Sequence, residues 1–236
     1  MNAFARILQP AALRKALPLA GLALLSACGS TPQPPDWQLE ARNAMERSVA
    51  AYLEGNNRVE MAELQRARNQ LARTGRADLL ATAELLHCAT RVASLVFEPC
   101  TAFEALRPDA LPAQRAYADY LRGRVPPQDI ALLPPLQHAA ATGDASAVVA
   151  AAEPLSQLVA AGVMLQAGTA TPAVIAQVME TASTQGWRRP LLAWLGVQAR
   201  RAEQAGNPEE AARLRRRIAL TLGSTPRTPD AGPATP

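Results

Sequence analysis

Lysine and aromatic residues are scarce in this chain of 236 residues. Lys15 is the only lysine, and Phe, Trp and Tyr together make up 4% of a sequence that is 49% hydrophobic. Alanine and leucine supply most of the apolar volume, a composition that favours closely packed helices over a β-sandwich, which needs β-branched and aromatic residues. Because no segment alternates convincingly between polar and apolar residues, the sequence predicts an all-α protein.

The sequence also lacks the common signatures of catalytic and metal sites. It contains no G-x-S-x-G, no H-E-x-x-H and no glycine-rich phosphate loop. Its two histidines, His87 and His138, fall into no recognised ligand spacing, so we expect no metal and no other cofactor. His87 aligns with Glu84 and Arg91 on one helix face, which predicts a solvated polar stripe. Glu60 is expected at a helix start, where acidic residues complement the helix dipole.

The first 27 residues are organised like a bacterial export signal. A few basic residues precede an apolar run from Ala16 to Leu25. This run is about 10 residues long, half of what a bilayer-spanning helix requires, and no later segment is long and apolar enough to span a membrane. The sequence Leu25-Ser26-Ala27-Cys28 then resembles the lipobox of bacterial lipoproteins. The alternative is an ordinary secretory signal followed by a chance cysteine.

The lipobox resemblance implies how the protein is modified and where it is sorted. Cleavage would occur before Cys28, whose thiol would carry a diacylglycerol thioether and whose new amino group would be acylated. Because Gly29 rather than aspartate follows, the resemblance implies the outer membrane, facing the periplasm, with inner-membrane retention as the alternative. The predicted organisation is a signal peptide over residues 1–27, a lipidated flexible tether over 28–35, a helical periplasmic domain over 36–222 and a disordered tail over 223–236.

Several boundaries within the helical domain can be predicted. Asn57 and Glu60 predict a capping box at the start of the second helix. Residues 123–135 form the least regular segment, with two Pro-Pro pairs around one apolar turn, and are either a break between two lobes or an ordered surface loop.

Trp187 and Trp194 are expected to anchor the core rather than to stack on a ligand.

Short glycine-containing joints predict antiparallel helical hairpins. Gly55-Asn56, Gly143-Asp144 and Gly206-Asn207 each end one helix and begin its neighbour within a few residues. Residues 202–214 resemble the turn of a tetratricopeptide repeat, in which Gly206, Asn207 and Ala211 match the family pattern. The joints lie 88 and 63 residues apart, which are not multiples of the repeat length of about 34. The expected fold is therefore a stack of antiparallel hairpins, a tetratricopeptide-like α-α superhelix, or an irregular helical bundle.

Two cysteines remain besides Cys28, namely Cys88 and Cys100. In an oxidising compartment this pair predicts a disulfide, which would stabilise the fold by about 3 kcal/mol through loop closure. Free thiols and a metal site are the alternatives. The third helix is expected to run from about Arg76 to about Phe97. A disulfide requires that it end no later than this, so that the chain can reverse.

Basic charge is concentrated near the C-terminus. Loss of the signal peptide's three basic residues lowers the formal net charge from +4 to about +1, so we expect no nucleic-acid partner. Residues 187–222 contain eight arginines and three glutamates, a net charge of +5, which leaves about −4 for the rest of the mature chain.

The last helix carries the best candidate for a binding surface. Its predicted buried stripe consists of Ala211, Leu214, Ile218 and Leu222. Outward-pointing arginines remain, and we interpret them as candidate partner-binding residues because guanidinium groups pair bidentately with carboxylates or phosphates. They are Arg213, Arg216 and Arg217. The alternative is a solvated helix surface.

The sequence favours a membrane-anchored periplasmic lipoprotein that acts as a non-catalytic scaffold. It would bind the membrane through its lipid and another cell-envelope protein through its helical surface. The alternatives are a peptidoglycan-acting hydrolase and an amphiphile-binding carrier, although the chain lacks the Glu-Ser dipeptide by which helical lytic transglycosylases resemble one another. A cleft with convergent acidic residues would indicate the hydrolase, a closed apolar cavity the carrier, and an open concave face the scaffold.

Overall fold

The computed structural model describes residues 34–223. The predicted signal peptide, Cys28 with most of its tether, and the tail after Gly223 lie outside the described residues. Within them the regular structure is entirely helical, which confirms the all-α class, and no helix has the length and apolarity needed to cross a bilayer. The helices are α1 (Asp36–Glu54), α2 (Asn57–Ala72), α3 (Ala77–Ala93), α4 (Thr101–Glu104), η1 (Arg107–Asp109), α5 (Pro112–Leu121), η2 (Pro127–Leu132), α6 (Pro135–Ala141), α7 (Ala145–Val149), α8 (Pro154–Gln166), α9 (Pro172–Thr184), α10 (Arg188–Gln204) and α11 (Pro208–Thr221).

Side-chain caps fix the starts of several helices. The side chains of Asn56, Asp144, Thr171 and Asn207 each accept a hydrogen bond from a backbone N–H in the first turn of α2, α7, α9 and α11. These bonds satisfy donors that a helix start otherwise leaves unpaired. The prediction that Asn57 caps α2 was wrong, because Asn57 is already the first helical residue and Asn56 supplies the cap.

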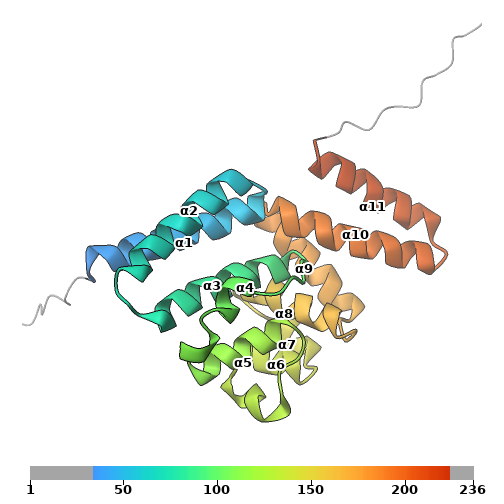
Figure 1. Cartoon of the computed structure of the whole chain (residues 1–236). Helices are drawn as coiled ribbons and strands as arrows, with labels where there is room; N and C mark the ends of the chain where they lie inside the picture. Colours follow the sequence, from blue (N-terminus) through green and yellow to red (C-terminus); the bar gives the residue numbers. More distant parts are fainter. Residues whose placement is uncertain (1–33, 224–236) are drawn as a thin grey trace, which may run out of the picture. The chain divides into compact units, whose positions relative to one another are not determined.

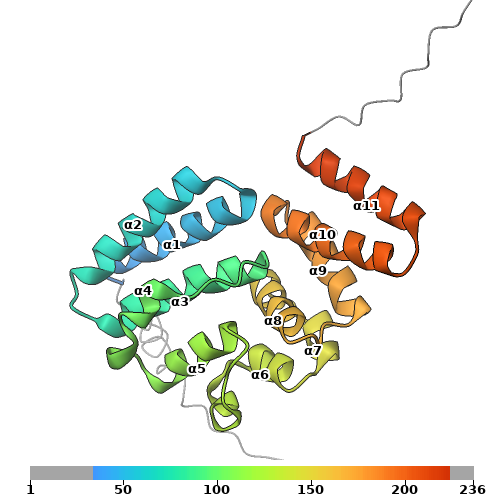
Figure 2. The same ribbon diagram turned by 45° about the vertical axis from the view of Figure 1, so that its right-hand side comes forward.

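Two helical hairpins lie next to each other along one side of the remaining helices (Figure 1). α1 packs against α2 and α10 against α11, and α1 also contacts α10. α3 lies between the α1–α2 hairpin and the helices α5 and α8, while α9 packs between α8 and α10 (Figure 2). α11 packs mainly on α10, so the face that it turns away from α10 is available to solvent.

α8 crosses α3 at a short distance in the core. Gly162 of α8 lies against the backbone of α3, and a Cβ added to it would be 2.6 Å from the carbonyl oxygen of Val92. Trp194 of α10 is fully buried, and its indole N–H donates to the carbonyl oxygen of Ala93, 3.1 Å away. Trp187 packs against the same core, so both tryptophans contribute to the core as predicted.

α3 ends earlier than the sequence predicted. Its last residue is Ala93 rather than a residue near Phe97. Leu95 reverses the chain with a φ of 61°, a left-handed conformation that glycine usually adopts at a helix end. Because the helix stops here, the chain has enough residues to return along α3, which brings Cys100 next to Cys88.

The irregular segment 123–135 is an ordered connection in the structure. It contains η2, which packs against α5 and α6. Leu133 is buried in the largest apolar cluster of the described residues, and Val125 and Ile130 pack against that cluster. The same cluster extends from α3 to α10, so buried side chains on both sides of the segment belong to one continuous core.

Candidate functional site

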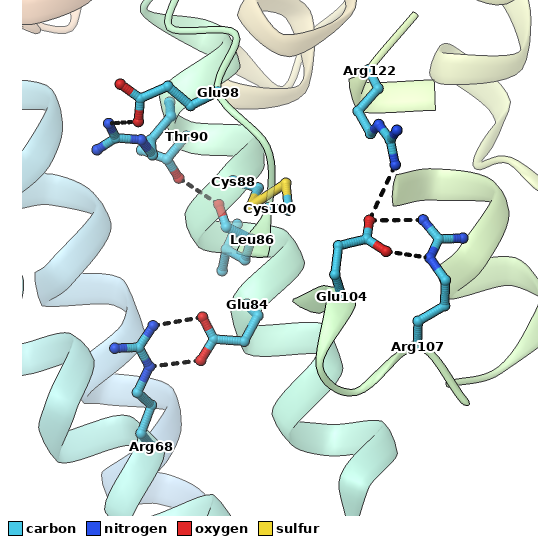
Figure 3. The surroundings of a disulfide bond; sticks show 11 residues. Arg68, Glu84, Leu86, Cys88, Thr90, Glu98, Cys100, Glu104, Arg107 and Arg122 are labelled. Carbon is cyan, nitrogen blue, oxygen red and sulfur yellow. Dashed lines mark hydrogen bonds and ion pairs between the residues drawn. A yellow bond between two sulfur atoms is a disulfide. The ribbon is translucent and has the colours of Figure 1, made fainter. Parts of the chain in front are cut away.

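A disulfide joins α3 to the start of α4. Cys88 and Cys100 have their Cα atoms 5.9 Å apart, within the range that a disulfide allows. Cys100 is buried, and the bond holds the returning chain against α3 (Figure 3). The pair that the sequence predicted is therefore at disulfide distance.

A buried ion pair lies near the disulfide. Glu84 of α3 is only 3% exposed and accepts two hydrogen bonds, each of 2.6 Å, from Nε and Nη2 of Arg68 in α2 (Figure 3). The prediction that Glu84 belongs to a solvated stripe was therefore wrong. Two parallel N–H···O bonds are the strongest arrangement of this pair, and they offset part of the cost of burying the carboxylate.

A second polar pair joins the same two helices. His87 of α3 has its Nε2 atom 3.1 Å from Oε1 of Glu60 in α2, and Glu60 is itself 4% exposed. Burial lowers the pKa of His87 below its usual value, although the carboxylate of Glu60 opposes this effect. Glu60 lies in the first turn of α2, as the sequence predicted, and is in addition buried against α3, which the sequence did not predict.

Arg68, Glu84 and His87 line a small cavity of about 190 Å³ beside the disulfide. Both of its acidic residues are paired with an arginine: Glu84 with Arg68, and Glu98 with Arg91 at 2.6 Å. A general acid or base must exchange its proton with a substrate, and a carboxylate held in an ion pair is poorly suited to this task. The arrangement supports a structural role, in which paired charges join α2, α3 and the returning chain.

A further ion-pair network connects α4 to α5. Arg107 donates two hydrogen bonds to Glu104, of 2.6 and 3.0 Å, and two to Asp119, of 2.9 and 3.4 Å (Figure 3 shows the Glu104 pair). Arg122 approaches the same Glu104 at 3.3 Å. Hydrogen bonding to Arg107 holds the pKa of Glu104 below its usual value. Because Arg107 contacts both Glu104 of α4 and Asp119 of α5, the network links the short α4 to α5.

An apolar groove follows the exposed side of α3. Two adjoining hollows of about 210 and 350 Å³ share Thr82 and Leu86 of α3 in their linings. The first extends to α1 and α2, and the second extends to α5 and the end of η2. We call the combined surface the α3 groove. Its apolar lining includes Trp37, Met45, Leu79, Leu86, Tyr117 and Leu132.

The α3 groove carries little charge and is open to solvent. Arg42 is the one charged residue of the described chain that lines it, and Glu46 pairs with that arginine at 2.8 Å. Leu132 is 43% exposed although it is fully apolar. Sequence reasoning missed this surface, because helix periodicity identifies the inner stripe of each helix but not the distance between neighbouring helices.

The predicted partner-binding arginines lie on the side of α11 that faces away from α10. Arg213 and Arg216 are exposed and Arg217 is half-buried. Arg213 donates two hydrogen bonds of 2.7 Å to Glu210, and this contact holds the pKa of Glu210 below its usual value. Arg216 and Arg217 form no ion pair with any described residue.

The predicted buried stripe of α11 is present only in part. Ala211 and Leu214 are buried, and Ile218 packs partly against α10. Leu222 was predicted to be buried but is 50% exposed, because it follows the last turn of a helix that packs mainly on α10. Leu220 is 62% exposed on the outer face, which the sequence prediction did not include.

Residues 34–223 contain no group of three or more His, Cys, Asp or Glu side chains placed to hold a metal ion. His138 lies on α6, away from the cavity beside the disulfide. Comparisons of the chain with models of known protein families, with curated proteins and with solved structures found no match.

Proposed function

We propose that the protein is a lipid-anchored, non-catalytic scaffold of the bacterial cell envelope that binds another envelope protein in the α3 groove. The observation that carries this proposal is the groove itself, an open and almost wholly apolar surface between the α1–α2 hairpin and α5. Contiguous exposed apolar surface on a protein commonly marks an interaction site.

The groove suits one face of an amphipathic helix. Leu79, Thr82 and Leu86 are spaced along one side of α3, and α1, α2 and α5 supply the walls. A helix that lies along α3 would bury these residues together with Leu132, in the manner of helix-in-groove recognition. The tetratricopeptide resemblance of the last hairpin supports a protein-binding role, since stacked helical hairpins present extended binding surfaces.

The other two candidate functions receive less support from the described residues. A hydrolase needs convergent carboxylates, whereas Glu84 and Glu98 beside the disulfide are both paired with arginine. An amphiphile carrier needs an enclosed apolar cavity, whereas the α3 groove is open along its length.

The proposed anchor is the lipid on Cys28. The domain begins at Asp36, and residues 29–35 have a reach of about 20 Å at the polyproline rise. A domain on such a tether stays close to the membrane surface, where it can meet other membrane-associated proteins. We place it at the periplasmic face of the outer membrane.

Site-specific photocrosslinking in living cells tests the partner site. A photoreactive residue at Thr82, exposed in the floor of the groove, should yield one defined adduct with an envelope protein. The same residue at Met61, which is 55% exposed on α2 outside the groove, should not yield that adduct.

A pair of matched variants then tests the chemistry of recognition. Leu132→Glu places a charge in the groove and should abolish the Thr82 adduct, while Met61→Glu should leave it unchanged. Both side chains are already exposed, so neither change should unfold the protein. Equal adducts from both crosslinking positions, or an adduct that survives Leu132→Glu, would show that the groove is not the partner site.

A further inference from the structure

We infer that the outer face of α11 docks on the anionic headgroups of a phospholipid membrane. This surface, which we call the α11 basic face, consists of Arg213, Arg216, Arg217 and Leu220. These residues are spaced i, i+3, i+4 and i+7, so they share one side of the helix. Ala211 lies on the opposite side and is buried against α10.

The charge distribution of the domain favours an anionic surface as the partner. Residues 187–222 carry a net charge of +5, whereas residues 36–186 contain 12 arginines and 16 acidic residues, a net charge of −4. A domain polarised in this way turns its C-terminal hairpin toward negative charge. Arg216 and Arg217 are free of ion pairs with described residues and are available to bind phosphate oxygens.

Apolar side chains beside the arginines favour a membrane over an acidic protein surface. Leu220 is the most exposed large apolar side chain of the described residues, at 62%, and Leu222, two residues further along the chain, is 50% exposed. Basic residues that surround an exposed leucine are the pattern of a helix that rests in the headgroup region, where the leucine enters the acyl boundary and the guanidinium groups contact phosphates.

A second membrane contact also has a physical use in a protein held by a lipid tether. A flexible tether fixes the distance of the domain from the membrane but not its orientation. Docking of α11 would fix the orientation as well. The lipid contact is separate from the α3 groove, so either site can fail its test without affecting the other.

Vesicle sedimentation tests the inference directly. The chain from residue 28 onward, with Cys28→Ser so that no lipid is attached, should bind vesicles of phosphatidylglycerol and phosphatidylcholine better than vesicles of phosphatidylcholine alone. Binding should weaken as salt is raised. The double variant Arg216→Gln/Arg217→Gln should bind about 25-fold more weakly, since each arginine near an anionic bilayer contributes roughly fivefold.

A control variant separates a specific face from net charge. Arg58→Gln/Arg73→Gln removes the same charge from exposed positions of the α1–α2 hairpin and should bind the anionic vesicles as the parent does. Leu220→Ser should lower the affinity without lowering the melting temperature, because its side chain already lies mostly in solvent.

Three results would overturn the inference. They are equal binding to both kinds of vesicle, an equal loss of binding in the control variant, and binding to polyglutamate with no binding to vesicles. The last would identify an acidic protein as the partner of the α11 basic face. Circular dichroism and thermal melting of each variant ensure that a loss of binding does not reflect a loss of fold.

Discussion

Gly162 in α8 contacts the carbonyl oxygen of Val92 in α3 so closely that a Cβ at this position would approach it to 2.6 Å. Real Cβ atoms do not come this close to backbone oxygen, so the two helices must separate to admit any side chain. Because Gly162 lies in the core shared by α3, α8 and α10, such a shift would loosen contacts throughout the domain.

We therefore expect Gly162→Ala to lower the free energy of unfolding by about 1–3 kcal/mol, as overpacked core substitutions do. Urea denaturation followed by circular dichroism measures this change. Gly196→Ala in α10 is the matched control, because its Cβ would meet only the guanidinium of Arg200 at 3.6 Å. The free energy of unfolding of that variant should increase by about 0.5–1 kcal/mol, because alanine has a higher helix propensity than glycine. The same sign of change in both variants would contradict this account of the helix crossing.

The buried pair between Arg68 and Glu84 should matter more for stability than exposed pairs do. Arg68→Gln leaves a carboxylate at 3% exposure without its charged partner, and we expect a loss of about 3–5 kcal/mol. Arg42→Gln breaks the exposed pair with Glu46, which should change the stability little because solvent screens both charges. Thermal melting of the two variants compares them directly. Similar melting temperatures would mean that the buried carboxylate finds another partner.

The disulfide should stabilise the domain by about 2–4 kcal/mol. The double variant Cys88→Ser/Cys100→Ser should therefore unfold at lower urea concentration than the oxidised protein. Reduced wild-type protein serves as the control and should unfold close to the double variant, since both lack the bond. A thiol titration of protein purified from the periplasm should find neither Cys88 nor Cys100 free. Two reactive thiols in that sample would rule out the disulfide.

The features of this architecture that could be predicted from the sequence are those that depend on residues close together in the chain. Glycine joints and proline at helix starts predicted the hairpins and most helix boundaries, because these residues act through their own backbone. The end of α3 was predicted too far along the chain, because the residue that reverses the chain there is not a glycine. Leu95 adopts the left-handed conformation that glycine marks elsewhere in the chain, and a leucine in the sequence gives no sign of it.

The buried charges could not be predicted, since their burial depends on residues from another helix. Glu84 and Glu60 lie at positions that look solvated when each helix is considered alone. Arg68 and His87, each on the neighbouring helix, make their burial possible by pairing with them. The α3 groove was missed for a related reason, because its width depends on how α1, α3 and α5 are spaced in three dimensions.

His87 should make stability depend on pH in the mildly acidic range. Burial lowers the pKa of His87 in the folded protein, and the positive charge of Arg91 lowers it further. These two effects outweigh the carboxylates of Glu60 and Glu84, which raise the pKa. The folded state therefore binds its proton less readily than the unfolded state, whose histidine titrates near 6.5. The contribution of neutral His87 to the free energy of unfolding has its full value above about pH 6.5, and it decreases as the pH falls below this value.

Replacing the histidine should remove this dependence. Between pH 7.5 and 5.5, the melting temperature of wild-type protein should fall more than that of His87→Gln, which cannot titrate. His138→Gln is the matched control, since that histidine lies outside the polar pair, and it should follow the wild type. A fall of equal size in His87→Gln would assign the pH dependence to other groups.

The lipid anchor can be tested independently of every structural feature described above. The thiol of Cys28 is the group on which the lipobox resemblance places the diacylglycerol, so Cys28→Ser should abolish incorporation of a labelled fatty acid. After a high-salt wash, which weakens the proposed contact of α11 with anionic headgroups, the variant should also be recovered in the soluble fraction, because residues 34–223 contain no spanning helix that could hold it in the membrane. Cys88→Ser/Cys100→Ser should still be labelled, which excludes a general effect of losing cysteine. Label that persists in Cys28→Ser would mean that the chain is not a lipoprotein of this kind.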